Sequence, residues 1–197
     1  MSDLLKVRVG GSSYLCRWEK EYSVKIGDRR YPAVKIGNQL WMAENLDNDI
    51  TEYTYHYLNY GAYYTVSEIN TGIGQLLQSC GVTGWHVPTM DEMNTMIDYV
   101  AAQEGTTRAY AGKYLLSTSE TGSVDDRYGL SLLLNGSYDG RDEYKQVTDA
   151  GIYVNLGERS DDNTYINRMY LNGYGYYGNG REYTYRKYGV RLVRTLT

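Results

Sequence analysis

The residue types that could carry out catalysis or bind a metal are few in this sequence and widely spaced. The two histidines are His56, in YTYHYLNY, and His86, in GWHVPT. A histidine acts as a general base or a metal ligand where other polar groups converge on it. His86 precedes a predicted helix, where a structural hydrogen bond is the expected role, and we expect His56 to be an exposed loop residue. Because G-x-S-x-G, P-loop and H-E-x-x-H motifs are also absent, we predict that the protein is not an enzyme.

The cysteines and the acidic clusters define no site either. Cys16 and Cys80 lie far apart and form no C-x-x-C pair, so we expect two free thiols, buried as small hydrophobic groups. The clusters DNDITE, SVDDRYG and SDDN carry oxygen ligands of the kind that calcium prefers, but their spacing fits no known calcium loop. We therefore predict no cofactor, and leave open only a structural Ca²⁺ ion.

Charge and hydropathy limit the partners of the chain. The formal net charge of −4 offers no concentrated basic face, so we expect no nucleic acid as partner. No apolar run is long enough to insert into a membrane, and the start MSDLLKVRVGGSSY lacks the pattern of a signal peptide, so display on a virion or a cell surface is expected to depend on another component. No pattern indicates an oligomeric state. We interpret one basic run as a solvated strand face; it contains Arg181, Arg186, Lys187, Arg191 and Arg194.

Two helices can be predicted from their first turns. Thr65 is followed three residues later by Glu68, and Thr89 by Glu92. This spacing is typical of a capping box, in which each side chain satisfies a free amide of the other residue. Apolar residues at helical spacing follow both boxes, and Gly105 is the expected end of the second helix.

The rest of the chain predicts short strands. KVRVGGSSYLCRW and YSVKIGD alternate around Gly-Gly and Gly-Asp turns, YPAVKIGNQLWMAENL is predicted as one strand ending near Trp41, and residues 51–64 are expected to be irregular. Beyond residue 110, strand-like pieces such as YGLSLLLNGSYDG, AGIYVNLG and YGVRLVRTL are separated by Gly, Asn and Asp. The order predicts an α+β class, with an N-terminal hairpin extension over residues 1–23 and one domain over residues 24–197.

Tyrosine is the dominant aromatic residue. The chain has 24 Tyr and no Phe, and the stretch YLNGYGYYGNGREYTYRKYG, residues 170–189, holds seven Tyr and five Gly. A buried hydroxyl costs free energy unless it has a hydrogen-bond partner, so this bias indicates that many rings face water or a ligand. The tyrosine-rich segment 53–64 could lie beneath such a surface or extend it.

Three motifs resemble the Fibrobacter succinogenes major paralogous domain: VKIGNQLWMAENL, GWHVPTMDEMNTMIDYV and the closing YGVRLVR. The resemblance runs from about Val24 to the end. It implies a C-type lectin-like fold, related to the formylglycine-generating enzymes, with paired terminal strands, two helices and a long loop-rich second half. The resemblance also implies that Trp41 and Trp85 are core anchors of the framework. The second half has no cysteine and therefore lacks the pair that the related enzymes use, and the chain lacks the Glu-Pro-Asn and Trp-Asn-Asp motifs of calcium-dependent sugar binding.

The last quarter also resembles the hypervariable region of variable proteins encoded by diversity-generating retroelements, which occur in phage and prophage. In these proteins asparagine codons are randomised at their adenines, which yields Tyr, Asn, Gly, Ser, Asp, Arg, Thr or Ile but neither Trp nor Gln. Neither residue occurs between Tyr153 and Tyr188. Glu158, Met169, Glu182 and Lys187 cannot arise in this way and would have to be unrandomised positions.

We therefore predict a non-enzymatic protein whose tyrosine-rich surface binds a macromolecular ligand, either a protein or a glycan, in the manner of a receptor-binding protein. Tyr, Gly, Ser and Asn form the mixture found in antibody paratopes. The alternative is a fixed bacterial surface or adhesion module that binds glycan or cell-wall material. The predicted contact residues are Tyr153, Asn155, Arg159, Asp161, Asn163, Tyr165, Tyr174, Tyr176, Tyr177, Asn179, Arg181, Tyr183, Tyr185, Arg186 and Tyr188.

Overall fold

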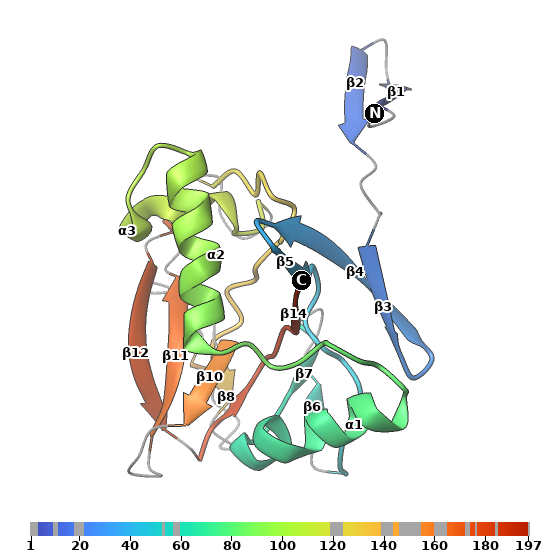
Figure 1. Ribbon diagram of the computed structural model, residues 1–197, viewed down its shortest axis with the longest axis vertical. Coiled ribbons are helices and arrows are strands. Elements are labelled where there is room, and N and C mark those ends of the chain that lie inside the picture. The colour runs from blue at the N-terminus through green and yellow to red at the C-terminus, as the bar shows by residue number, and fades with distance from the viewer. Residues whose placement is uncertain are drawn as a thin grey trace.

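The chain folds into small antiparallel sheets with helices packed beside them, so it is of the mixed α+β class (Figure 1). The computed structural model describes residues 4–9, 12–17, 22–52, 54–56, 60–118, 124–138, 144–145, 155–159, 165–171, 174–175, 177–183 and 185–196.

Two hairpins open the chain, as the Gly-Gly and Gly-Asp turns predict. Strands β1 (Leu4–Val9) and β2 (Ser12–Arg17) pair with each other in a two-stranded sheet, which stands apart from the other strands in Figure 1. Strand β3 (Tyr22–Ile26) turns at Gly27 into β4 (Arg29–Ile36), and Val24 and Ile26 are buried while Lys25 is exposed.

The main sheet has the strand order β14-β5-β4-β3 and corrects two expectations. The predicted single strand ending near Trp41 is a hairpin of β4 and β5 (Gln39–Met42), because Gly37, at φ +62°, takes the left-handed conformation that reverses the chain. The C-terminal strand β14 (Val193–Thr195) pairs with β5. Strands β3 and β14, the first and last of this sheet in chain order, are therefore its two edges. They do not pair with each other, so the expected pairing of terminal strands is wrong for this sheet.

Both capping boxes form. The Thr65 hydroxyl accepts from the Glu68 amide at 3.2 Å while the Glu68 carboxylate accepts from the Thr65 amide at 2.8 Å, at the start of the π-helical turn η1 (Glu68–Gly72) and helix α1 (Ile73–Ser79). Thr89 and Glu92 make the same pair of bonds at the start of α2 (Met90–Gln103). Gly105, at φ +60°, follows the end of α2 as expected.

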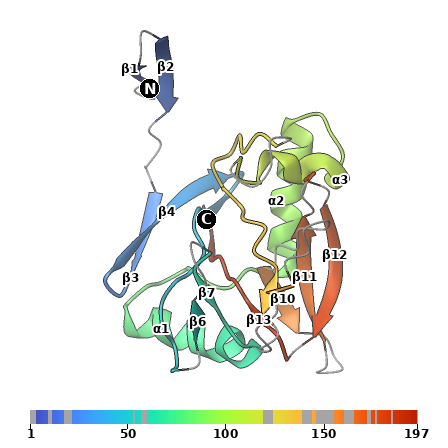
Figure 2. The same cartoon turned by 180° about the vertical axis from the view of Figure 1, so that it is seen from behind.

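Short strands and turns make up the second half. Helix α3 (Arg108–Ala111) continues into the 3-10 turn η2 (Gly112–Tyr114), and the predicted strand YGLSLLLNGSYDG forms only β8 (Ser137–Tyr138) within its described part. The remaining strands are β6 (Tyr55–His56), β7 (Ala62–Tyr63), β9 (Tyr144–Lys145), β10 (Asn155–Arg159), β11 (Tyr165–Leu171), β12 (Tyr177–Tyr183) and β13 (Lys187–Tyr188). Helix α2 contacts β10 and β11, and α3 contacts β12 (Figures 1 and 2).

Two hydrophobic clusters form the core. One lies between the main sheet and α1 and includes Trp85, which is 8% exposed. The other lies between the main sheet and α2 and includes Trp41, which is fully buried. The expectation that both tryptophans are core anchors is confirmed.

A buried arginine connects distant parts of the fold. Arg191 is fully buried, so the interpretation of the basic run as a solvated face is wrong for this residue. Its Nε donates to the Asn45 side-chain oxygen at 2.8 Å, and its terminal nitrogens donate to the main-chain oxygens of Leu130, of Ser131 at 2.6 Å and of Met42 at 3.3 Å. The charged group is buried here because carbonyl oxygens surround it.

Replacing Arg191 by Met should reduce the free energy of unfolding by about 3 kcal/mol or more, because several buried acceptors would lose their donor together. Urea denaturation measures this change. Arg194→Met, at an exposed position three residues later, is the matched control and should stay within about 0.5 kcal/mol of wild type. An Arg191→Met protein as stable as the control would contradict the role assigned to Arg191.

Acid should weaken the start of α2. Burial alone would raise the pKa of Glu92, but hydrogen bonds from the Thr89 amide, His86 and Thr195 outweigh it and lower the pKa. A lowered pKa stabilises the fold above the unfolded value of about 4.3, and this contribution is lost as the pH falls through the folded value. Glu92→Gln should therefore cost about 1 kcal/mol at pH 7, and the difference between the two proteins should shrink as the pH falls below about 4.3. A gap between the two proteins that persists in acid would argue against this origin.

Candidate functional site

Three tyrosines and two basic residues gather at the end of the molecule where β6, β8 and β13 lie. Tyr138 on β8 is the cross-strand partner of Lys187 on β13. The ring of Tyr55, from β6, stacks on Tyr138 with centroids 4.3 Å apart and planes at 1°. All three residues are half-buried. With Tyr185 and Arg186 they form a surface that we call the tyrosine face.

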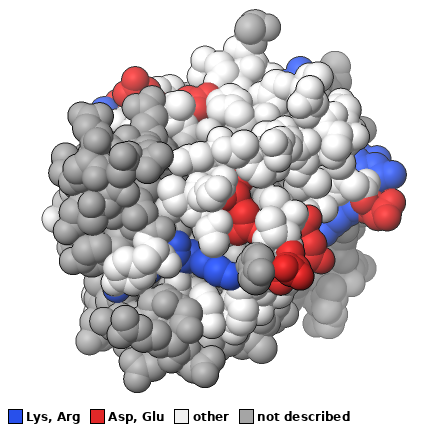
Figure 3. All heavy atoms as spheres, turned by 90° about the horizontal axis from the view of Figure 1, so that it is seen from below, with Lys and Arg blue, Asp and Glu red and all other residues white. Residues whose placement is uncertain are grey.

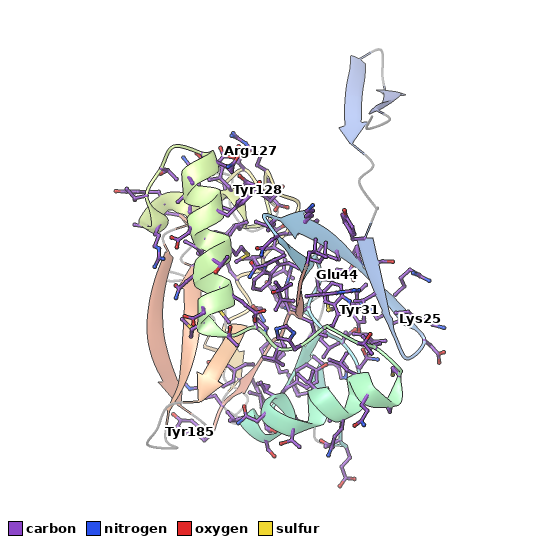
Figure 4. The ribbon with its side chains drawn as sticks, viewed as in Figure 1. Lys25, Tyr31, Glu44, Arg127, Tyr128 and Tyr185 are labelled. Carbon is purple, nitrogen blue, oxygen red and sulfur yellow. The ribbon has the colours of Figure 1, made fainter. Side chains whose placement is uncertain are left out.

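Tyr185 is the exposed residue of this face. It is 63% exposed, and the Arg186 guanidinium lies 5.7 Å from the centre of its ring, within the range of a cation–π contact. Arg186 also donates to the Ser137 hydroxyl at 3.4 Å, which ties the turn to β8. Figure 4 shows Tyr185 at the end of the molecule opposite Arg127 and Tyr128, and Figure 3 shows that acidic and basic side chains lie next to each other on this end.

Tyr188 corrects the predicted contact set. It is fully buried, so the prediction that its ring is exposed is wrong. Strand β13 pairs with β8 on one side, and on the other side the backbones of Tyr188 and Tyr64 exchange two hydrogen bonds of 2.9 Å. A strand with neighbours on both sides is internal, and the alternation of side chains turns Tyr188 inward when Lys187 turns outward.

Tyr174 lies far from Tyr185. It is 68% exposed and sits in the turn between β11 and β12, where the next residue, Gly175, packs against Lys113 of η2. Tyr185 follows the other end of β12. A strand of seven residues spans about 20 Å, so the two exposed tyrosines lie at opposite ends of β12. The predicted contact residues therefore do not form one compact patch.

Strand register gives the backbone positions of several predicted residues. Tyr177, Asn179, Arg181 and Tyr183 occupy alternate positions of β12. At one end of this set, Tyr177 is paired with Leu171, which is fully buried against the helical side of the core. Asn155 and Arg159 lie on β10, and Tyr165 lies on β11. The positions that lie outside the described residues are Tyr153, Asp161, Asn163 and Tyr176.

The described residues of the tyrosine-rich segment 53–64 lie both beneath the tyrosine face and within it. Tyr63 and Tyr64 are buried, and the Tyr63 hydroxyl donates to the Asn135 main-chain oxygen at 2.5 Å. Tyr55 is half-buried and stacks on Tyr138. Tyr55 and Tyr138 are not among the predicted contact residues, and only the composition of their segments could have indicated them.

Both histidines hold polar loops in place. His86 Nε2 lies 2.8 Å from Glu92, which confirms the expected structural hydrogen bond. His56, with 43% of its side chain exposed, lies between Asp47 and Asp49 at 2.7 and 2.8 Å. Burial would lower the pKa of His56, but the bonds to Asp49 and Asp47 outweigh it and raise the pKa. Both ring nitrogens of His56 therefore link β6 to the loop after β5.

A polar cavity of about 480 Å³ adjoins this loop. On its wall, Arg29 pairs with Glu44 at 3.3 Å and with Asp47, so opposite charges compensate each other. Over the described part of the chain, no three His, Cys, Asp or Glu side chains are arranged to hold a metal ion. Cys80 is a free, partly buried thiol that accepts from the Gly27 amide at 3.2 Å, while the Cys16 side chain lies outside the described residues.

Among the described residues, each helix is too short or too polar to span a bilayer.

Comparison with known proteins gives one match. The family model of the Fibrobacter succinogenes major domain covers residues 34–194, which is most of the chain. No curated protein and no solved structure matches the sequence.

The tyrosine face and the core below it should respond differently to truncation. Tyr188→Ala should lower the free energy of unfolding by about 3 kcal/mol or more, because it opens a cavity in the core. Tyr185→Ala, three residues earlier on the exposed turn, is the matched control and should stay within about 0.5 kcal/mol of wild type. Denaturant unfolding of both variants measures the contrast, and equal losses would show that Tyr185 also belongs to the core.

Proposed function

The chain belongs to the Fibrobacter succinogenes major domain family, and within this family we propose that it is a non-enzymatic ligand-binding protein. Its contact region comprises the tyrosine face and the turn at Tyr174, joined by β12. The ligand is a macromolecule, either a protein or a glycan. The fold is proposed to be C-type lectin-like.

The observation that carries the proposal is the exposure of tyrosines on backbone that the core holds in place. Tyr185 and Tyr174 are 63% and 68% exposed, whereas Tyr188 and Leu171, which border the same stretch, are fully buried. An exposed ring has only two torsion angles to restrict on binding, and a fixed backbone loses little further entropy. Each ring buried against a partner would contribute on the order of 1 kcal/mol or more.

The separation of the two exposed tyrosines favours a large ligand. A small molecule occupies a cavity of a few hundred Å³ and could not contact residues about 20 Å apart. A protein partner of standard size covers about 800 Å² on each side and could contact both turns. Arg186 and the exposed Tyr185 form a pair of residue types that are enriched in protein interfaces.

The origin of this composition is proposed to be diversification by a retroelement, with a phage or prophage as its source. The support is the absence of Trp and Gln between residues 153 and 188 and the density of Tyr, Asn and Gly. Lys187 is a position that such randomisation cannot reach, and its half-buried place opposite Tyr138 fits a framework residue.

Binding should depend on the exposed ring at residue 185. The protein would be screened on arrays of bacterial surface proteins and of cell-wall glycans, and every spot bound by wild type would be titrated with the variants. We expect Tyr185→Ser to weaken binding at least tenfold with an unchanged melting temperature. Lys25→Ser, an exposed residue of β3 (Figure 4), is the control and should bind as wild type does. Undiminished binding by Tyr185→Ser would remove the tyrosine face from the contact surface.

The surrounding gene tests the proposed origin separately. An imperfect copy of the last quarter, differing only where the copy carries adenine and accompanied by a reverse transcriptase frame, is the expected finding. If that copy is missing and the tyrosine codons have mixed third positions, the proposed origin is wrong, and the alternative of a fixed surface or adhesion module is favoured.

A further inference from the structure

We infer that Gly175 is a positioning residue of the contact surface, and that Gly175, Tyr188 and Gly189 are fixed points of the tyrosine–glycine stretch, which varies at other positions. This inference rests on the proposed function, because it states which positions of that surface can change. The fixed points are the contact of Gly175 with η2 at one end and the buried pair Tyr188–Gly189 at the other.

The first fixed point is a close approach of two backbones. Gly175 is buried and has φ +77°, a conformation that residues with a side chain rarely adopt. A Cβ atom added to it would overlap the backbone nitrogen and Cα of Lys113 and would lie 2.6 Å from the Lys113 Cβ. Backbone atoms cannot move aside as the end of a flexible side chain can. The turn that carries Tyr174 is therefore held against η2 only while residue 175 is glycine.

Gly112 is the other half of this contact. A Cβ atom there would overlap the end of the buried Leu171 side chain and would lie 2.6 Å from the Gly175 main-chain oxygen. Gly112 begins η2, outside the last quarter of the chain. One glycine from the framework and one from the tyrosine-rich stretch thus meet, and Leu171 packs beside them.

The second fixed point follows the exposed turn at Tyr185. Tyr188 is fully buried, and its backbone pairs with that of Tyr64. A Cβ atom on the next residue, Gly189, would overlap the side-chain nitrogen of Asn135, which is itself buried. Substitution at either residue would therefore disturb the core.

These contacts divide the stretch by function. Gly175, Tyr188 and Gly189 belong to the framework even though their residue types match the diversified composition. Tyr174 is adjacent to Gly175, and Tyr185 lies three residues before Tyr188. Both side chains are exposed to solvent. A change at residue 174 would alter what the surface binds, whereas a change at residue 175 would release the turn that presents it.

Paired glycine substitutions test the packing. Asparagine tolerates positive φ better than other residues, so Gly→Asn separates backbone conformation from steric overlap. Gly175→Asn should lower the melting temperature of the full chain by several degrees. Gly105→Asn is the matched control, because Gly105 has φ +60° and no atom lies within 4 Å of an added Cβ; its melting temperature should stay close to that of wild type. Equal melting temperatures for the two variants would overturn the inference.

A display library tests the positioning role. Residues 174, 175, 185 and 188 would be randomised in the full chain with codons of the diversified type, displayed on yeast and selected for binding to streptavidin as a test protein. Binders should vary at 174 and 185 while glycine at 175 and an aromatic residue at 188 rise above their starting frequencies. Binders that vary freely at 175 would overturn the inference and leave the proposed function standing. A library that is displayed folded but yields no binders would count against the proposed function instead.

Discussion

The buried guanidinium of Arg191 is the interaction on which the arrangement of the fold depends. A charge removed from water is tolerated only where donors and acceptors are matched, and here four oxygens from separate segments accept from one side chain. These segments are the end of β5, the loop at Asn45 and the turn at residues 130–131. Arg191 lies between β13 and β14, so the same contacts fix where the end of the chain runs.

The environment of Arg191 also explains a strained turn. Asp126 and Ser131 have φ of +38° and +52°, values that are unusual for residues with side chains. The Asp126 carboxylate accepts from the amide and the hydroxyl of Ser131, at 2.8 and 2.6 Å, and the Ser131 main-chain oxygen accepts from Arg191. Burial raises the pKa of Asp126, while its bonds with Ser131 and the charge of Arg191 act in the opposite direction. The turn keeps its conformation because the arginine holds its carbonyl oxygens.

In such a framework, the residues that stabilise the fold differ from those proposed to contact a ligand. The free energy of folding comes from the two hydrophobic clusters and the polar contacts that join them, and the described exposed tyrosines lie outside those clusters. The stretch between Leu171 and Gly189 is attached at both ends, and its turns carry the exposed rings of Tyr174 and Tyr185. Such a surface can change its side chains at little cost to the fold, which is the property that the proposed binding function requires.

Local structure and family membership could be predicted from the residues alone. The capping boxes at Thr65 and Thr89, the turns at Gly27 and Gly105, and the anchoring role of Trp41 and Trp85 depend on neighbours within a few residues or on strong hydrophobicity. The division of residues 29–42 into two strands at Gly37 was missed, because an alternating pattern continues through the turn.

Which tyrosines and arginines are buried depends on contacts between distant segments and could not be predicted from composition. Tyr185 and Tyr188 have similar sequence surroundings, yet one is exposed and the other is in the core, because Tyr188 pairs with Tyr64, more than a hundred residues away. Arg191 is buried by oxygens that come from residues 42–45 and 130–131, and Gly175 is constrained by Lys113. The residue type limits which environments a side chain can occupy. Whether it is buried or exposed depends on partners from distant parts of the sequence, which come together only when the chain folds.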